Sequence, residues 1–163
     1  MYGGGGAADV LFGGPGHDFL YGGYGVTGTS DGVQLYGEDG DDEIWSTLYG
    51  NAELWGGKGD DLLLAAAPVP SAYGNTRFPN RNLNEDFTAI AGFTFSYGSH
   101  DMQGGPGDDF IMGGYGDDDI YGGEGDDIIY GNQLNAATYG NDYIEGGPGD
   151  DFIAGVDAAS GTD

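Results

Sequence analysis

Short triplets with a large aliphatic residue in the middle recur along this chain at intervals of nine residues or slightly more. Three of them, Phe110–Met112, Asp119–Tyr121 and Ile128–Tyr130, follow one another between 104 and 130 with the same spacing. In an extended strand successive side chains point to opposite faces, so the middle residue of each triplet would point inward and its neighbours outward. The pattern predicts an all-β chain of short strands joined by turns.

The middle residue of the triplet is large and aliphatic in every repeat, including the repeats that are otherwise degenerate. Such a row of inward-pointing side chains would form a single core ladder, stabilised by the removal of apolar surface from water. The expected members of this row are Leu11, Leu20, Leu35, Ile44, Leu54, Leu63, Met102, Ile111, Ile120, Ile129, Ile144 and Ile153.

The residues before each triplet are rich in glycine and aspartate. The clearest copies are GGPGDDFIM (104–112), GGYGDDDIY (113–121) and GGEGDDIIY (122–130). Glycine at the first, second and fourth positions permits backbone conformations closed to other residues, which lets carbonyl groups approach an ion closely. Aspartate at the sixth position supplies a carboxylate, and Ca²⁺ prefers a shell made of oxygen ligands. The turns are therefore candidate calcium sites.

The same pattern, G-G-x-G-x-D-x-U-x with U large and aliphatic, also occurs at 13–21, 37–45, 56–64 and 146–154. It resembles the hemolysin-type calcium-binding repeat of the RTX family along most of the chain. The resemblance implies a single domain over 1–163, folded as a right-handed parallel β-roll of about six two-repeat turns, which is a calcium-bound β-solenoid. In that fold successive repeats turn on opposite edges, and Ca²⁺ lies between stacked turns of one edge.

The two edges of such a roll differ in this chain. Counted from residue 4, every repeat longer than nine residues is odd-numbered, so one edge carries no insertion and is called here the uninterrupted edge. The resemblance implies up to five ions on it, bound by the sixth-position carboxylates Asp18, Asp42, Asp61, Asp109, Asp127 and Asp151. It also implies ligands from the turn glycines Gly13, Gly16, Gly37, Gly40, Gly56, Gly59, Gly104, Gly107, Gly122, Gly125, Gly146 and Gly149.

The second edge carries the insertions, which are expected near 26–31, 46–50 and 133–138 and, as a long flap or loop, at about 65–98. The sixth positions of this edge are less regular. Asp118 is the best candidate ligand there, followed by Asp142 and then Asp9, while His100 stands at the aspartate position of a degenerate turn. We therefore expect fewer calcium ions on the second edge.

The two sheets of the expected roll differ on their outer faces. The triplets after the uninterrupted edge are FLY, EIW, LLL, FIM, IIY and FIA, whereas those after the second edge are VLF, QLY, ELW, DMQ, DIY and YIE. The first sheet is thus apolar on both faces, and such a sheet is normally covered. The cover is either the flap at about 65–98 or another subunit, because a large exposed apolar patch usually marks an interface.

Composition and charge narrow the possible functions. Glycine supplies 37 of the 163 residues, and 28 Asp and Glu against 3 Lys and Arg give a net charge of −25. Nucleic acid is excluded as a partner, because phosphate binding needs a basic face. The chain has no cysteine, and it has no run of 18 apolar residues that could span a bilayer. Such an acidic chain needs cations to fold, which agrees with Ca²⁺ as its cofactor.

No catalytic constellation stands out in the sequence. With two histidines and three basic residues, acid–base and phosphoryl chemistry have few groups to use. Paired aspartates such as Asp108 and Asp109 are already explained by the turn motif, and we expect the fifth-position acids to face solvent. The chain is therefore predicted not to be an enzyme.

Three functional interpretations follow. In the first, the chain is a secreted, calcium-binding structural protein of the cell surface or extracellular space. It would fold on Ca²⁺ and self-assemble, end to end or laterally, into a filament or surface layer. In the second, it is a calcium-folded RTX module of a larger secreted toxin, adhesin or hydrolase. In the third, its outward aromatic residues bind a glycan or another surface, as in an adhesion module.

Overall fold

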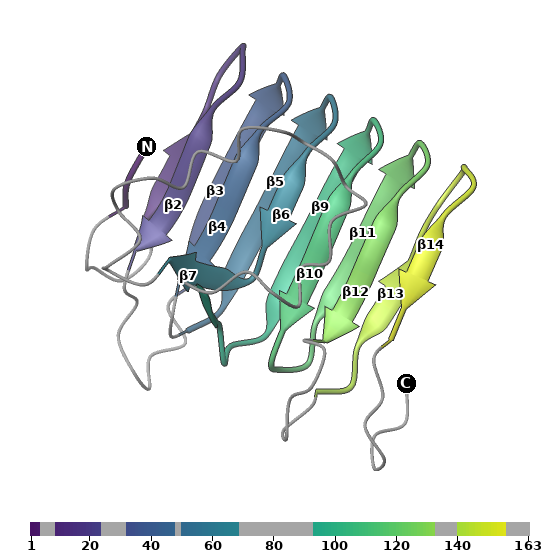
Figure 1. Ribbon diagram of the computed structural model, residues 1–163. Coiled ribbons are helices and arrows are strands. Elements are labelled where there is room, and N and C mark those ends of the chain that lie inside the picture. Colours follow the sequence, from purple (N-terminus) through teal and green to yellow (C-terminus); the bar gives the residue numbers. More distant parts are fainter. Residues whose placement is uncertain (4–8, 24–31, 48–49, 69–92, 133–139, 156–163) are drawn as a thin grey trace.

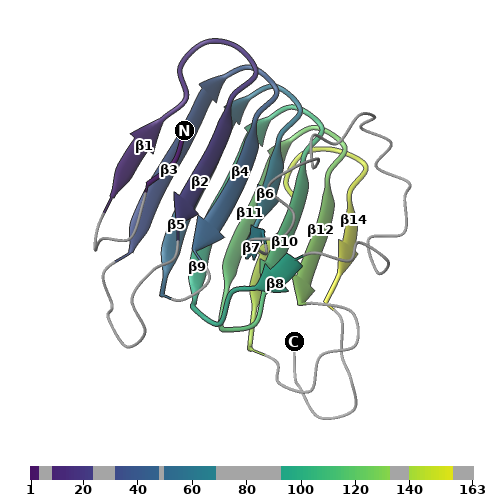
Figure 2. The ribbon, with the colours of Figure 1, turned by 60° about the vertical axis from the view of Figure 1, so that its left-hand side comes forward.

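The computed structural model describes residues 1–3, 9–23, 32–47, 50–68, 93–132 and 140–155. The chain winds between two parallel six-stranded sheets and adds one strand to each sheet per turn (Figure 1). The two sheets lie face to face as the walls of a flattened coil, as the turned view in Figure 2 shows. The predicted β-roll of six turns is therefore confirmed.

Each sheet collects the strands that follow one edge, in the order predicted from the alternation of repeats. Sheet 1 follows the second edge and contains β1 (Val10–Phe12), β3 (Val33–Asp39), β5 (Ala52–Lys58), β9 (His100–Pro106), β11 (Asp119–Glu124) and β13 (Tyr143–Glu145). Sheet 2 follows the uninterrupted edge and contains β2 (Phe19–Gly23), β4 (Glu43–Thr47), β6 (Leu62–Leu64), β10 (Phe110–Gly114), β12 (Ile128–Asn132) and β14 (Phe152–Ala154).

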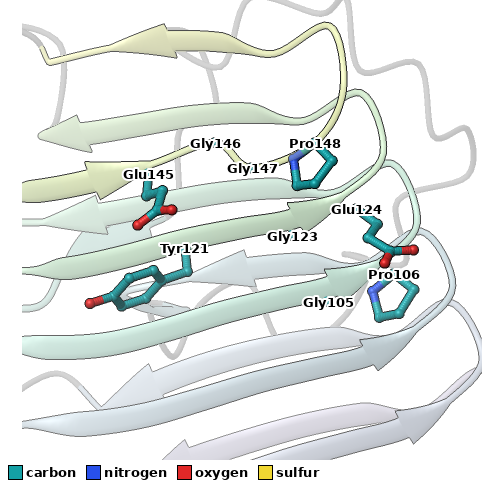
Figure 3. A pocket seen from close by; sticks show the side chains of 9 residues that line it. All are labelled: Gly105, Pro106, Tyr121, Gly123, Glu124, Glu145, Gly146, Gly147 and Pro148. Carbon is teal, nitrogen blue, oxygen red and sulfur yellow. The ribbon is translucent and has the colours of Figure 1, made fainter.

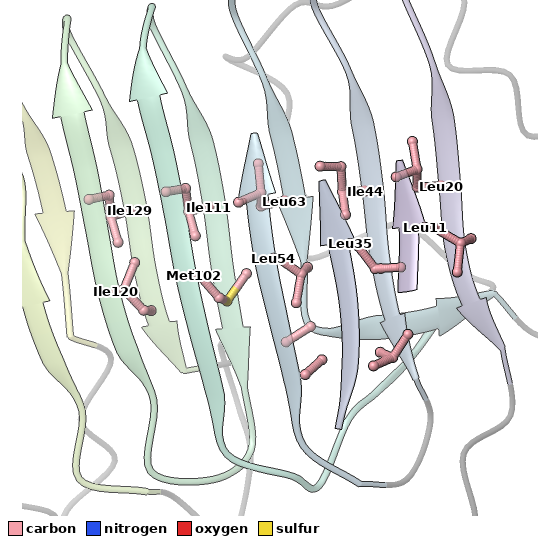
Figure 4. Packing of buried hydrophobic residues seen from close by; sticks show 13 residues of the cluster. Leu11, Leu20, Leu35, Ile44, Leu54, Leu63, Met102, Ile111, Ile120 and Ile129 are labelled. Carbon is pink, nitrogen blue, oxygen red and sulfur yellow. The ribbon is translucent and has the colours of Figure 1, made fainter. Parts of the chain in front are cut away.

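The register of the strands sets the core residues of successive turns directly beside one another. Ile111 pairs with Leu63 on one side and Ile129 on the other, and the same stepwise pairing runs through sheet 1. These side chains fill the space between the sheets (Figure 4), and burying each contributes about 1.5–3 kcal/mol. The predicted row is confirmed except at the last turn, where Ile144 is partly buried and Ile153 is 46% exposed.

The outer face of sheet 2 is covered within the single chain. Its almost fully buried side chains are Tyr21, Trp45, Leu64, Phe110 and Met112. A small antiparallel pair, β7 (Ala66–Pro68) and β8 (Phe93–Phe95), lies on this side of the roll, and β7 contacts β4 (Figure 2). Most of this apolar face is thus buried without a second subunit.

The first residues of the chain extend sheet 2 beyond β2. The Gly3 N–H donates to the Tyr21 carbonyl at 2.8 Å, and the Tyr21 N–H donates to the Met1 carbonyl at 3.0 Å. Tyr2 forms a parallel bridge with Tyr21. The β2 backbone is therefore paired on both sides.

Several sequence predictions fall outside the described residues. These are most of the flap, at 69–92, and most of the shorter insertions, at 24–31, 48–49 and 133–139. Within the described ranges, no helix has the length and apolar character needed to cross a membrane.

Candidate metal centre

The six sixth-position aspartates of the uninterrupted edge form one continuous hydrogen-bonded row, called here the carboxylate row. In each step the Oδ1 of one aspartate accepts the backbone N–H of the aspartate one turn earlier. The N···O distances are 2.7 Å for Asp18–Asp42, Asp42–Asp61 and Asp61–Asp109, 2.9 Å for Asp109–Asp127 and 3.1 Å for Asp127–Asp151. The structure thus brings together the complete set predicted from the repeat lengths.

The inner part of the carboxylate row is buried. Its four inner members are almost inaccessible to solvent, while the two end members are partly exposed. The Oδ2 atoms of Asp109 and Asp127 are buried and have no hydrogen-bond partner among the described residues. A buried carboxylate oxygen without a partner is costly, so a cation next to these atoms would stabilise the fold.

First-position glycines make room for the carboxylates. A Cβ built on Gly104 would lie 2.1 Å from Oδ2 of Asp109 and 2.5 Å from the carbonyl oxygen of Gly122 in the next turn. Gly56 stands in the same relation to Asp61, with 2.3 Å between the built Cβ and Oδ2. Only glycine therefore allows a carboxylate oxygen and a carbonyl oxygen of the next turn to lie side by side.

Fourth-position glycines align a second set of oxygens. Gly107 has a φ of 144°, in the left-handed region that favours glycine. A Cβ built on it would lie 1.9 Å from the carbonyl oxygen of Gly59, one turn earlier, and Gly125 meets the Gly107 carbonyl in the same way at 2.0 Å. Backbone carbonyl oxygens thus point from each turn toward the next along the uninterrupted edge.

Burial changes the acidity of the row. Burial, with a smaller contribution from Asp61 and Asp127, raises the pKa of Asp109 to about 8, although the Asp61 N–H acts in the opposite direction. Burial also raises the pKa of Asp127 to about 6, and the charge of Asp151 adds to that effect. These carboxylates resist ionisation, because burial disfavours the charged form and no described residue beside them carries a positive charge.

The fifth-position acids form a second row that the sequence analysis missed. Oδ1 of Asp108 accepts the N–H of Asp126 at 2.9 Å, and Oδ1 of Asp60 accepts the N–H of Asp108 at 3.1 Å. The acceptor here belongs to the earlier turn, so this row runs opposite to the carboxylate row. The three side chains face solvent, as expected, but they also connect successive turns.

The donor set of the uninterrupted edge suits a calcium ion. It consists only of oxygen atoms, with one carboxylate per turn and the carbonyls of the turn glycines, and Ca²⁺ is a hard cation that takes such ligands in flexible geometry. The members of the carboxylate row and the first- and fourth-position glycines would hold the ion. Its positive charge would offset the carboxylates and provide a partner for Oδ2 of Asp109 and Asp127, which have none within the described ranges.

The second edge lacks such a row. Its sixth positions are, in order, Asp9, Val33, Ala52, His100, Asp118 and Asp142. Val33 and Ala52 are buried in the hydrophobic core, so two turns have replaced the carboxylate with apolar packing. Asp118 donates its N–H to Oδ1 of Asp142 at 3.1 Å, and Asn132 Nδ2 donates to the other oxygen of Asp142. Of the three ligands predicted on this edge, Asp118 and Asp142 thus lie in neighbouring turns. Asp9 is separated from His100 by the two turns that carry Val33 and Ala52.

Comparison with known families agrees with this geometry. A sequence profile described as RTX calcium-binding nonapeptide repeat (4 copies) matches residues 3–26, 26–48, 49–67, 103–135 and 136–157, well over half of the chain. The chain belongs to the RTX calcium-binding nonapeptide repeat family. Neither a search of curated proteins nor a search of solved structures gave a match.

This RTX chain is therefore a calcium-binding β-roll module. All six members of the carboxylate row lie within the matched segments, whereas 68–102 lies between two of them. His100 belongs to that unmatched stretch, together with Ser96, whose contact with His100 the sequence analysis did not foresee. No regular spacing links Ser96 to the repeat, so only the folded chain reveals the contact.

The RTX roll also has an open hollow of about 410 Å³ on the outer face of sheet 1 (Figure 3). Its lining residues are Gly105, Pro106, Tyr121, Gly123, Glu124, Glu145, Gly146, Gly147 and Pro148. Bare glycine backbone forms its floor between the larger side chains. No member of the carboxylate row lines the hollow, although Gly146, a first-position glycine of the uninterrupted edge, does.

Proposed function

We propose that this chain is a secreted structural protein whose β-roll folds as Ca²⁺ binds along the uninterrupted edge. The observation that carries the proposal is the buried carboxylate row, in which Oδ2 of Asp109 and Asp127 has no partner in the described part of the chain. Such a row repels itself without cations. Because ions would bind the folded chain and not the unfolded one, their binding energy becomes folding energy.

The proposal includes a place of action outside the cell. Extracellular calcium modules typically have affinities near 10⁻⁴–10⁻³ M, and a site in that range fills only where calcium is abundant. The chain would remain unfolded at the low calcium of the cell interior and fold after export. Its net charge of −25 favours an expanded chain before calcium is met.

We further propose that folded rolls stack end to end, a step that the direction of the carboxylate row supports. Among the described residues nothing accepts the backbone N–H of Asp151, and nothing donates to the carboxylate of Asp18. If the last turn of a second copy displaced Met1–Gly3 from the outer side of β2, it would join these two groups and continue the row. Apolar side chains exposed at the two end turns add to the contact; they are Val10, Phe12, Phe152 and Ile153. Such a head-to-tail contact does not close, so it produces a filament.

Sedimentation velocity on the 163-residue chain tests both parts. We expect a slow, expanded monomer in chelator and large particles in millimolar Ca²⁺. Samples in Mg²⁺, and in NaCl at equal ionic strength, serve as controls for charge screening, because Mg²⁺ demands a stricter octahedral shell and dehydrates reluctantly. These control samples should resemble the chelator sample.

Each contrary outcome removes a defined part of the proposal. A compact monomer in calcium would contradict end-to-end assembly and favour a module of a larger secreted protein. Equal compaction in NaCl or Mg²⁺ would contradict calcium-specific folding, since screening alone would then suffice.

A further inference from the structure

His100 occupies a sixth position of the second edge, where the repeat normally has aspartate. It begins β9, pairs with Ala52 of β5, and lies one turn before Asp118. Its side chain is fully buried, as is that of Asp118. The ring therefore lies between two stacked turns, in the part of the repeat that on the uninterrupted edge contains only oxygen ligands.

All polar groups of His100 that face the neighbouring turn are hydrogen-bonded. Its backbone N–H donates to Oδ1 of Asp118 at 2.8 Å, as in the carboxylate row, and Nδ1 lies 2.8 Å from the same oxygen. Its Nε2 lies 3.1 Å from Oγ of Ser96. Because a carboxylate can only accept, the network assigns a ring proton to Nδ1.

The contrast with the uninterrupted edge is direct. There, the Oδ1 of Asp127 accepts only the backbone N–H of Asp109. No side chain among the described residues donates a hydrogen bond to the carboxylate of Asp109 or of Asp127. On the second edge a side-chain N–H of His100 reaches the corresponding oxygen of Asp118. A protein donor thus serves Oδ1, the Asp118 oxygen that faces the turn of His100. Oδ2 of Asp118 lies on the side of Gly113 and the Gly131 carbonyl of the following turn and has no partner among the described residues, so it belongs to the next step of the edge.

Ser96 extends this contact to the chain segment that precedes β9. Its N–H donates to the Ala65 carbonyl at 2.8 Å, and its carbonyl accepts the Tyr115 N–H at 3.0 Å. The order Ser96–His100–Asp118 matches that of a hydrolase triad, but all three residues are buried, so no substrate reaches the Ser96 hydroxyl. Its role is to hold the ring and the returning segment in place.

We propose that His100 replaces a calcium ion between its own turn and the turn of Asp118, so that this step of the second edge is held by hydrogen bonds without metal. The inference rests on the proposed uptake of calcium by the uninterrupted edge. It makes His100 a residue that determines where along the roll calcium binds, and Ser96 the residue that positions its ring.

Counting bound ions by native mass spectrometry in saturating Ca²⁺ tests this role. The variant His100→Asp restores a carboxylate opposite Asp118 and should take up one ion more than the wild-type chain. The matched control is His17→Asp, which restores an acid at an exposed fifth position of the uninterrupted edge, where the polar contacts of the His17 ring with described residues are all to Asp41. The control should leave the ion count unchanged.

The possible outcomes separate this inference from the proposed function. A wild-type chain that takes up no calcium would contradict both. A folded His100→Asp variant with the wild-type count, or a gain that His17→Asp shares, would contradict only the role of His100. Should His100→Asp fail to fold, His100→Ala decides: an unchanged count supports a metal-free step, and the loss of one ion shows that the wild-type chain binds calcium there.

Discussion

Two adjacent aspartates in five of the six turns of the uninterrupted edge have different roles. Asp109 is buried, with Oδ2 against the first-position glycine of its own turn, whereas Asp108 is exposed. Both accept one backbone N–H, from turns on opposite sides. The difference between them is therefore burial of charge, which makes the sixth-position residue the one that needs an ion.

Replacing Asp109 with asparagine should weaken calcium binding by at least about tenfold, equivalent to ~1.4 kcal/mol. Asparagine keeps an oxygen that can accept the Asp61 N–H but removes the charge that attracts the ion. Asp108→Asn is the matched control and should change the affinity less than about twofold, since its exposed charge is screened. Calcium titrations followed by circular dichroism measure both variants, and equal losses would contradict the division of roles.

Strict periodicity explains which residues could be predicted from sequence. Position eight is aliphatic in the twelve triplets, so the core row followed from spacing. The carboxylate row needed both the repeat lengths and the alternation of edges that the resemblance to the RTX repeat implies. Val33 and Ala52 join the core because their turns have lost the aspartate, a substitution that the strand pattern does not reveal. The contact between His100 and Ser96 depends on the path of the segment before β9, which lies outside the repeat pattern and so could not be predicted from it.

At the scale of the element, the turn depends on close stacking of backbone on backbone. Turns of equal length bring carbonyls against the Cα atoms of glycines, and this constraint sets the register between strands as firmly as the core does. The sequence analysis took the alternation of repeats between two edges, and with it the order of the strands, from the resemblance to the RTX repeat. It did not derive the pairing of Tyr2 with β2, because the first residues are too short a copy of the repeat.

Gly104→Ala should destabilise the calcium-bound roll by at least ~1 kcal/mol, because its Cβ would lie 2.1 Å from the Asp109 carboxylate. For a chain of this size the melting temperature should fall by about 2–4 °C or more. Gly32→Ala is the control, since its nearest described neighbour would be 3.4 Å from the new Cβ. Thermal unfolding in saturating calcium measures both. A Gly104→Ala variant as stable as Gly32→Ala would show that the roll does not require glycine at the first position beside the Asp109 carboxylate.

At the scale of the whole molecule, acidity and folding are linked. Burial in the fold raises the pKa of Asp109 from 3.8 to about 8 and that of Asp127 to about 6. Between the unfolded and folded pKa values the folded chain binds more protons. The free energy of unfolding therefore falls as the pH rises through this interval, with the full contribution present only below about pH 4.

In chelator, the β content of the chain should thus increase on acidification from pH 8.5 to 4.5, as measured by circular dichroism. In saturating Ca²⁺ the signal should change little over the upper part of this range, because the ion stabilises the ionised carboxylates. Asp109→Asn should reduce the calcium-free dependence between pH 6 and 8. A calcium-free signal that rises with pH would contradict the burial of these groups.

Because the two rows of aspartates run in opposite directions, neighbouring turns from Asp41–Asp42 onward each donate one backbone N–H to the other and accept one in return. Each turn therefore adds about 4.8 Å to the length of the roll and contains the groups that fix its spacing from the next turn. Inserting a second copy of residues 104–121, which contain two repeats and no insertion, would lengthen the roll by one turn and leave its cross-section unchanged. The length of a protein built in this way is determined by its number of repeat pairs, so evolution or design could change that length one turn at a time.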